Sequence, residues 1–325
     1  MTDQNKTDQN KLISALPDDP LGEGDDFVAA FQIEDQPVRG RIARLGDATL
    51  DAILQRHDYP KWAATLLGEA LTLAVLSAAS LKFDGKITVQ AQGDGPVSLM
   101  VAEARSDGGL RGYLRIDKEK WDVLEAVNKG GRPHVPQAIG KGVLGMILTP
   151  DDPDQSPYQG IVPLEGATLA DCAQAYFNQS EQIPTRVHLA VGQIVEPGKP
   201  TRWRSGGALL QQVAGDDARG ETAEQWNTAS ILFETLSDVE LADPDLSAGR
   251  LLFRLFNEDG VRLEPGKPIV DRCTCTEDAL LRSLSNLTVD EVRSLAEKDG
   301  TIRAGCQFCG RSYGVELSAF EAGLS

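Results

Sequence analysis

Four cysteines in the last part of the chain have the types and the spacing of metal ligands. They form a C-x-C pair and a C-x-x-C pair on either side of residues 276–305, and they are Cys273, Cys275, Cys306 and Cys309. Thiolates bind zinc tetrahedrally, and two such pairs can present four sulfurs to one ion while the residues between them fold as a loop or helix. Gly305 and Gly310 flank the second pair, which suits the tight turn of a zinc knuckle. The spacing therefore predicts a structural zinc site. Two independent thiol pairs, or cysteines without a shared role, are the alternatives.

A glycine pattern further upstream matches the letters of a dinucleotide-binding fingerprint. It consists of Gly140, Gly142 and Gly145. That fingerprint requires a strand before it and a helix that opens on it. Here the chain runs on through Met146-Ile147-Leu148 into a stretch rich in Pro and Asp. We therefore expect no nucleotide site at these glycines.

The histidines and the fifth cysteine form no catalytic arrangement in the sequence. His57, His134 and His188 have no Cys, Ser or carboxylate at a spacing that builds a triad or a metal site. Cys172 lies in a helical pattern, where the ordinary role of a cysteine is that of a small buried hydrophobic residue. We expect no catalytic residues and no enzymatic activity.

The elements ahead of the cysteines alternate irregularly between strands and helices. Trp62–Leu81 contains Glu69 as its sole charged residue, and its content of Ala, Thr and Ser predicts a buried core helix rather than a membrane span. A second helix is expected over Leu169–Phe177, and strands are expected from Phe27 onward and over Lys86–Gln92, Val97–Ala104, Leu110–Ile116, Val143–Leu148 and Val187–Val191. The three strands from Lys86 to Ile116 should form an antiparallel meander. Strands and helices without a strict βαβ order predict an α+β core.

Composition changes divide the chain into four expected parts. Residues 1–26 repeat TDQNK and have few apolar groups, which predicts a disordered acidic tail. The α+β core should cover residues 27–215. From Asp216 to Gly249 acidic residues far outnumber the single basic residue, Arg219, while apolar residues recur at helical spacing, so residues 216–267 should form a helical linker. After the Pro- and Gly-rich stretch at residues 264–268, a small zinc-binding domain should cover residues 268–325.

The net charge indicates which partners the protein can bind, and the cysteine content indicates the compartment in which it works. The 325 residues carry 32 Lys and Arg against 49 Asp and Glu, and a net charge of -17 repels nucleic-acid phosphates and anionic lipid headgroups. The last domain also has no basic stripe. Five cysteines are too few for a disulfide scaffold, and residues 1–26 lack the apolar stretch of a secretory signal. We expect a protein of the reducing cytoplasm that binds neither nucleic acid nor membranes.

The cysteine spacing resembles that of the redox-regulated heat-shock chaperones of 33 kilodaltons, the 33 kDa chaperonin family. The likeness extends over roughly residues 27–315. The segments that carry it are Arg39-Gly40, Leu81–Gly85, Gln92–Pro96, Leu110–Tyr113, Gly140-Lys141-Gly142 and Tyr176–Thr185. This chain departs from the family pattern in having Thr276, where Ser is usual, and in its acidic N-terminal tail.

The resemblance implies a redox-controlled holdase. It implies that the reduced protein holds one Zn²⁺ per chain through Cys273, Cys275, Cys306 and Cys309 and is inactive. Oxidants would then join Cys273 with Cys275 and Cys306 with Cys309 as disulfides, release the zinc and unfold the linker. The resemblance further implies ATP-independent binding of unfolded or oxidatively damaged client proteins, and a homodimer in the oxidised state. The chain agrees with the independence from ATP, since it contains no G-x-x-x-x-G-K-[ST] loop.

Two other functions compete with that of a holdase. A thiol-disulfide oxidoreductase could use Cys306 and Cys309 as a dithiol, but this would require a helix start beside a βαβ unit, whereas the flanking glycines indicate a turn. A zinc ribbon could instead serve as a docking module on an unidentified core. Zinc content measured together with client aggregation separates these three.

Overall fold

The computed structural model describes residues 24–82, 84–213 and 222–322, and the chain forms two compact units, Met1–Asp271 and Arg272–Ser325. Most of the expected acidic tail, together with Asp216, Asp217, Arg219 and Glu221 of the expected linker, lies outside the described residues. The end of the expected tail differs from the prediction. Asp25 pairs with Arg204 at 2.6 Å, and Asp26 accepts a hydrogen bond from the Gly46 amide at 2.9 Å, so both residues belong to the folded unit.

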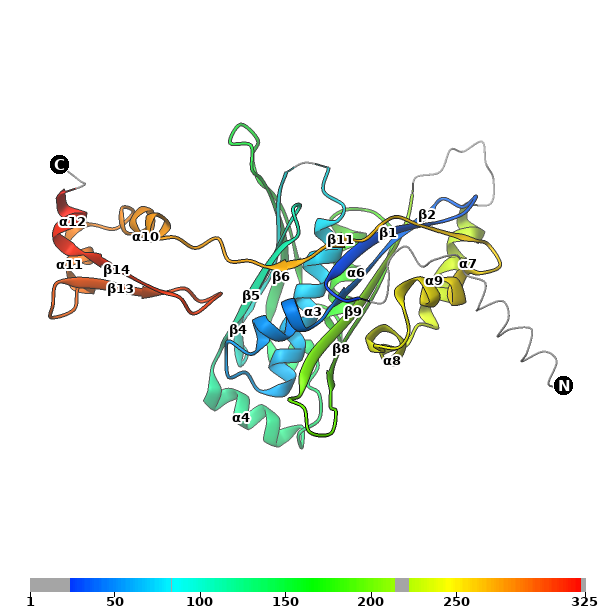
Figure 1. Cartoon of the computed structure of the whole chain (residues 1–325), viewed down its shortest axis with the longest axis horizontal. Helices are drawn as coiled ribbons and strands as arrows, with labels where there is room; N and C mark the ends of the chain where they lie inside the picture. Colours follow the sequence, from blue (N-terminus) through cyan, green and yellow to red (C-terminus); the bar gives the residue numbers. More distant parts are fainter. Residues whose placement is uncertain (1–23, 83, 214–221, 323–325) are drawn as a thin grey trace. The chain divides into compact units, whose positions relative to one another are not determined.

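Two six-stranded sheets form the larger unit (Figure 1). The first sheet has the order β10-β1-β2-β9-β8, and β11 also pairs with β1. Its strands are β1 (Phe27–Ile33), β2 (Val38–Leu45), β8 (Thr185–Ile194), β9 (Arg202–Gln212), β10 (Val261–Leu263) and β11 (Lys267–Pro268). The second sheet has the order β12-β5-β4-β3-β6-β7. Its strands are β3 (Gly85–Gly93), β4 (Val97–Arg105), β5 (Gly109–Ile116), β6 (Gly142–Pro150), β7 (Tyr158–Pro163) and β12 (Val270–Asp271). Neighbours β3, β4 and β5 pair antiparallel, so the expected meander is confirmed.

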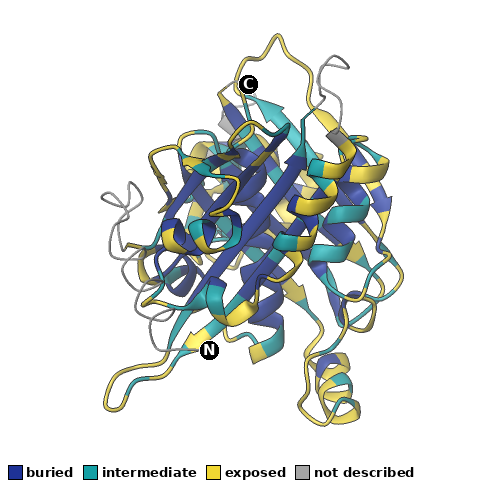
Figure 2. Cartoon of the chain, turned by 90° about the vertical axis from the view of Figure 1, so that its right-hand side faces the viewer, coloured by how far each residue is buried: buried dark blue, intermediate teal, exposed yellow. Residues whose placement is uncertain are grey.

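A central helix packs against strands of both sheets. This helix, α3 (Lys61–Ala78), is buried at every residue after Trp62, as its run of Ala, Leu and Val requires. Among the described residues no helix has both the length and the apolar character needed to cross a membrane, in agreement with the core-helix prediction. The remaining helical segments of this part are η1 (Asp47–Asp51), α2 (Ala52–Leu54), α4 (Lys118–Val127), α5 (Val135–Ala138) and α6 (Leu169–Gln179). In Figure 2 the buried residues lie along the strands and on the inward faces of helices, and exposed residues lie on the outward faces of helices and in loops.

Three linker helices cover the other face of the first sheet. They are α7 (Thr222–Glu234), α8 (Asp238–Ala242) and α9 (Ala248–Phe256). Ser237 and Ser247 cap α8 and α9 by accepting hydrogen bonds from backbone amides, which separates one amphipathic stretch into distinct helices. Phe233 and Leu241 from these helices pack with Phe31 of the first sheet in one apolar cluster. The linker stretch therefore docks its apolar side on the core.

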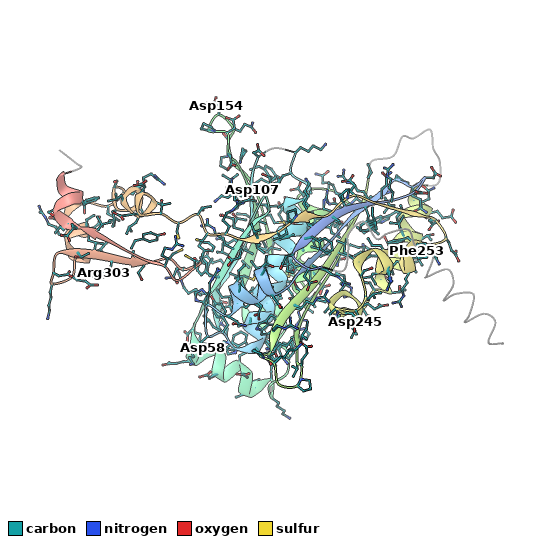
Figure 3. All side chains as sticks on the ribbon, viewed as in Figure 1. Asp58, Asp107, Asp154, Asp245, Phe253 and Arg303 are labelled. Carbon is teal, nitrogen blue, oxygen red and sulfur yellow. The ribbon has the colours of Figure 1, made fainter. Side chains whose placement is uncertain are left out.

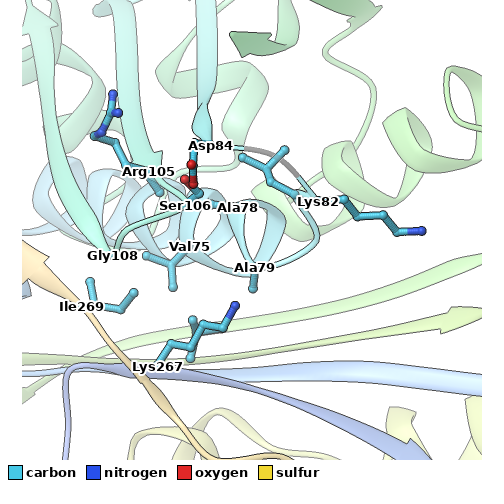
Figure 4. Close-up of a pocket in the computed structure, with 13 residues that line it drawn as sticks. Val75, Ala78, Ala79, Lys82, Asp84, Arg105, Ser106, Gly108, Lys267 and Ile269 are labelled. Atoms are coloured by element: carbon cyan, nitrogen blue, oxygen red, sulfur yellow. The ribbon is translucent and has the colours of Figure 1, made fainter. Parts of the chain in front are cut away.

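A short segment, residues 267–271, joins both sheets, and we call it the strap. Its first part, β11, pairs with β1, and its last part, β12, pairs in parallel with β5. Between them Ile269 is buried, and its amide donates to the Asp26 carbonyl at 2.7 Å. The strap forms one wall of a cavity of about 340 Å³ that also borders the end of α3 and the β4–β5 turn (Figure 4). The last domain was expected to begin at residue 268, whereas residues 268–271 pair with core strands and the compact C-terminal unit begins at Arg272.

The C-terminal unit, Arg272–Ser325, is small and mixed in structure. Its elements are α10 (Glu277–Leu284), α11 (Val289–Leu295), β13 (Thr301–Gly305), β14 (Ser312–Glu316) and α12 (Leu317–Ala322). β13 and β14 form an antiparallel hairpin, on which Arg303 pairs with Glu297 and Asp299 (Figure 3). The buried apolar side chains described for this unit are Leu284, Val292, Ile302, Val315 and Phe320. So small a core is typical of domains that need a metal or disulfides to fold.

Candidate metal centre

Two chain segments bring the four predicted cysteines together. Cys273 and Cys275 lie in the segment just before α10, where Thr276 caps the helix by accepting a hydrogen bond from the Ala279 amide. Cys306 follows β13 directly, and Cys309 lies in the turn that leads to β14. The helix cap and the hairpin therefore fix the two ends from which the thiols project.

The hairpin turn has the geometry of a knuckle. The Gly310 amide donates to the Cys306 carbonyl at 2.8 Å, and the Cys306 amide donates to the Arg311 carbonyl at 2.8 Å. Gly310 has a φ of 72°, in the left-handed region that favours glycine. The turn therefore needs glycine at residue 310, as the sequence pattern indicated.

The four sulfurs lie within 4.8 Å of one another. Two of the contacts cross between the pairs, with Cys273 Sγ 3.7 Å from Cys306 Sγ and Cys275 Sγ 3.4 Å from Cys309 Sγ. A tetrahedral site with metal–sulfur bonds of about 2.3 Å has sulfur–sulfur edges of about 3.8 Å. The observed spacing thus fits four ligands of one tetrahedral ion. Within the described residues this is the one group of His, Cys, Asp and Glu side chains identified as able to hold a metal.

A tyrosine that sequence reasoning did not select completes the site. The Tyr313 hydroxyl donates to the Cys275 carbonyl at 2.9 Å and lies 3.2 Å from Cys275 Sγ. Burial alone would raise the pKa of the Cys275 thiol, but its hydrogen bonds with Tyr313 and with the other cysteines outweigh burial and lower the pKa to about 7. The site therefore favours a thiolate at this position. The signal in the sequence was only a tyrosine four residues after Cys309, which is too common to single out.

The alternative candidate residues do not join this site. Cys172 is fully buried in α6, in the larger unit, and burial raises the pKa of its thiol to about 11. Cys306 and Cys309 lie in a hairpin turn and not at a helix start, so a thioredoxin-like placement is absent from the described part of this unit. Gly142 opens strand β6, so no helix follows the glycine pattern, as expected.

The histidines also lie apart from the cysteines. His188 on β8 contacts Asp238 through Nε2 at 2.7 Å. His134 precedes α5, and the His57 ring lies 5.0 Å from the Tyr59 ring. Each belongs to the larger unit, and none joins the group of residues that could hold a metal.

Comparison with known proteins places the chain in a family. The family model described as "Hsp33 protein" matches residues 26–316. The 33 kDa chaperonin of Caulobacter vibrioides is 50% identical over 293 residues, which cover 90% of this chain and 95% of the relative. That of Serratia proteamaculans is 36% identical over 288 residues, which cover 89% of this chain and 91% of the relative.

A solved structure has the same fold. The crystal structure of the 33 kDa chaperonin from Thermotoga maritima matches with a TM-score of 0.70 and 23% identity, covering 91% of this chain and 97% of that one. The range matched by the family model includes both cysteine pairs and the whole core. We conclude that the chain belongs to the Hsp33 protein family.

Proposed function

We propose that this protein is a redox-regulated, ATP-independent holdase of the cytoplasm, which binds unfolded or oxidatively damaged client proteins and prevents their aggregation. The names of the curated relatives support a chaperone. The observation that carries the redox part of the proposal is the cluster of four thiols within 4.8 Å in a unit with a very small core. As in the family that the sequence resembles, we expect the oxidised form to be a homodimer.

In the reduced state Cys273, Cys275, Cys306 and Cys309 would hold one Zn²⁺. Bound zinc would supply a structural cross-link between the helix cap and the hairpin, worth about 10 to 16 kcal/mol in small zinc modules. A unit with five described buried apolar side chains depends on such a cross-link. The C-terminal unit should therefore be folded with zinc and unfolded without it.

Oxidation would remove the ligands. Cys273 with Cys275, and Cys306 with Cys309, would each form a disulfide as the two thiolates of the pair lose two electrons to an oxidant such as hydrogen peroxide, which takes up two protons from the solvent and is reduced to two molecules of water, while the Zn²⁺ is released. These disulfides close loops of three or four residues and restrict the unfolded chain by only about 1.6 to 1.9 kcal/mol each. They are too weak to replace the metal, so the oxidised unit should stay unfolded.

We propose that the linker helices, whose inner faces are apolar, are released when the C-terminal unit unfolds. Phe233, Leu236 and Leu241 are each at most 4% exposed while α7 and α8 are docked. Release of α7 and α8 would expose these side chains and the face of the first sheet beneath them. Apolar surface exposed on both sides would bind the apolar segments of unfolding clients.

A paired assay tests the proposal. Zinc content and the aggregation of a thermally unfolding client are measured on the reduced protein and again after peroxide. The holdase should lose about one zinc per chain and gain activity together. Constant zinc with thiol exchange activity would indicate an oxidoreductase, and zinc without any client protection would indicate a docking module. Cys273→Ser should lower zinc affinity, and an unchanged affinity would contradict the four-thiolate site.

A further inference from the structure

The shortest linker helix makes several polar contacts with the core. Helix α8 has five residues, and isolated helices of this length are unstable in water. It follows the turn after α7 and precedes the turn that contains Asp245, ahead of α9 with Phe253 (Figure 3). Its stability must therefore come from the surface on which it docks.

Two buried arginines of the core bind the C-terminal end of α8. Arg44 on β2 donates through Nη1 to the Asp243 carbonyl at 3.0 Å and through Nη2 to the Glu240 carbonyl at 3.3 Å. Arg204 on β9 donates to the Ala242 carbonyl at 2.7 Å. Each arginine is only 2% exposed. The last carbonyls of a helix lack partners within the helix and carry partial negative charge, so two guanidinium groups are well matched to them.

A glycine between the two arginines lets α8 approach the sheet. A Cβ atom added to Gly206 on β9 would lie 2.1 Å from the Leu241 carbonyl oxygen, which belongs to the backbone of α8 and cannot move alone. Arg44 and Gly206 are direct neighbours across β2 and β9. Glycine at this position is therefore required for α8 to dock as closely as it does.

Contacts at the other end and in the middle complete the attachment. Asp238, the first residue of α8, contacts His188 on β8 at 2.7 Å. Leu241 in the middle is 0% exposed and packs in the apolar cluster of the linker and the first sheet. Helix α8 is thus bound at its start, its middle and its end. Arg204 also pairs with Asp25, so it retains a carboxylate partner when α8 leaves.

We propose that Arg44, Arg204 and Gly206 form an autoinhibitory latch that recognises the C-terminal turn of α8, and that release of α8 from this latch is the step that opens the linker. The inference rests on the proposed function, because it names the contact that keeps the holdase inactive when reduced. The latch can bind only a linker with a particular backbone conformation. Glu240, Ala242 and Asp243 must present their backbone carbonyls to the two arginines, so a docked linker must end a helix at this point.

The test uses the full-length, zinc-loaded, reduced protein with Gly206→Ala. Its matched control is Gly192→Ala, a glycine on β8 opposite Arg204, at which an added Cβ meets nothing within 4 Å. Hydrogen exchange is followed at residues 238–243, with α3 and β3 as internal references. Arg44→Met is the second variant, and because it leaves carbonyls unpaired it should accelerate exchange in α8 by roughly tenfold to a hundredfold.

The latch predicts that Gly206→Ala and Arg44→Met accelerate exchange in α8, retain zinc and hold clients without oxidant, while Gly192→Ala behaves as wild type. Unchanged exchange in α8 in both variants overturns the latch. The latch is also overturned if both variants accelerate exchange in α8 but hold no client when reduced, while the oxidised wild type does hold clients. If exchange accelerates as predicted but oxidised wild type holds no client, the latch stands and the proposed function fails. If Gly206→Ala also loses exchange protection in α3, the substitution has destabilised the whole core. The result for Arg44→Met then decides whether the latch exists.

Discussion

Replacing Phe233 by alanine should open helix α7 in the reduced protein. Phe233 is 2% exposed and packs in the apolar cluster that joins the linker helices to the first sheet. A buried Phe→Ala change costs about 3 to 5 kcal/mol. Because this cluster joins α7 to the first sheet and to the other linker helices, the cost falls on the docking of α7. At about 1.4 kcal/mol per factor of ten, the undocked fraction of α7 should rise by roughly a hundredfold or more.

Client aggregation and hydrogen exchange at residues 222–236 measure the effect under reducing conditions. Ile231→Ala is the matched control, since Ile231 lies on the same helix and is 56% exposed. The Phe233 variant should protect a client without oxidant and should still contain zinc, whereas the Ile231 variant should need oxidant. If reduced Phe233→Ala shows opened α7 and no client protection, exposure of this surface is not what creates activity. If α7 stays as protected as in wild type, the packing argument itself is wrong.

Three further predictions concern other parts of the chain. Cys172→Ser should leave zinc content and oxidative activation intact, because Cys172 is buried in α6 of the other unit, and loss of switching would show that the wrong thiols were assigned. Burial raises the pKa of Glu69 from 4.5 to about 7 against the opposing effect of Arg132, so the core should lose up to about 3 kcal/mol of stability as pH rises from about 4.5 through 7. Glu69→Gln should flatten this dependence in denaturant titrations, and an unaltered slope would assign it to other groups. The amides of Ile269 and Val270 donate to the Asp26 and Gly108 carbonyls, so they should keep their exchange protection after oxidation, and exchange as fast as at Cys275 would contradict an anchored strap.

The sequence predicts the regular parts of the fold because their signals are local. Helix α3 is a long apolar run, and β3, β4 and β5 are apolar stretches separated by glycine turns, so composition and spacing suffice. The strap could not be predicted in this way. β11 and β12 have two residues each, and their pairing depends on β1 and β5, which are far away in the chain.

The candidate site divides along the same line. The four cysteines could be predicted as metal ligands from their spacing alone, since each pair needs only its own turn to present two sulfurs. Tertiary contacts between distant segments of the chain give Tyr313, Arg44 and Arg204 their roles. A charged residue in a strand pattern normally indicates a solvent-exposed position, yet both arginines are buried beneath α8. The residues missed are therefore those whose partners are set by tertiary structure.

The strap also determines what happens to the linker after it has been released. The linker leaves the first sheet at the end of β9 and returns to it at β10, so residues 213–260 form a loop whose two ends are both held by the core. If the strap stays paired, undocked helices cannot diffuse away, and the core meets them at an effective concentration that tethering keeps high. Re-docking after reduction would then be a unimolecular step, independent of protein concentration. A client would therefore have to compete with a permanently attached segment for the same surface, and its dissociation would be assisted each time the linker returns.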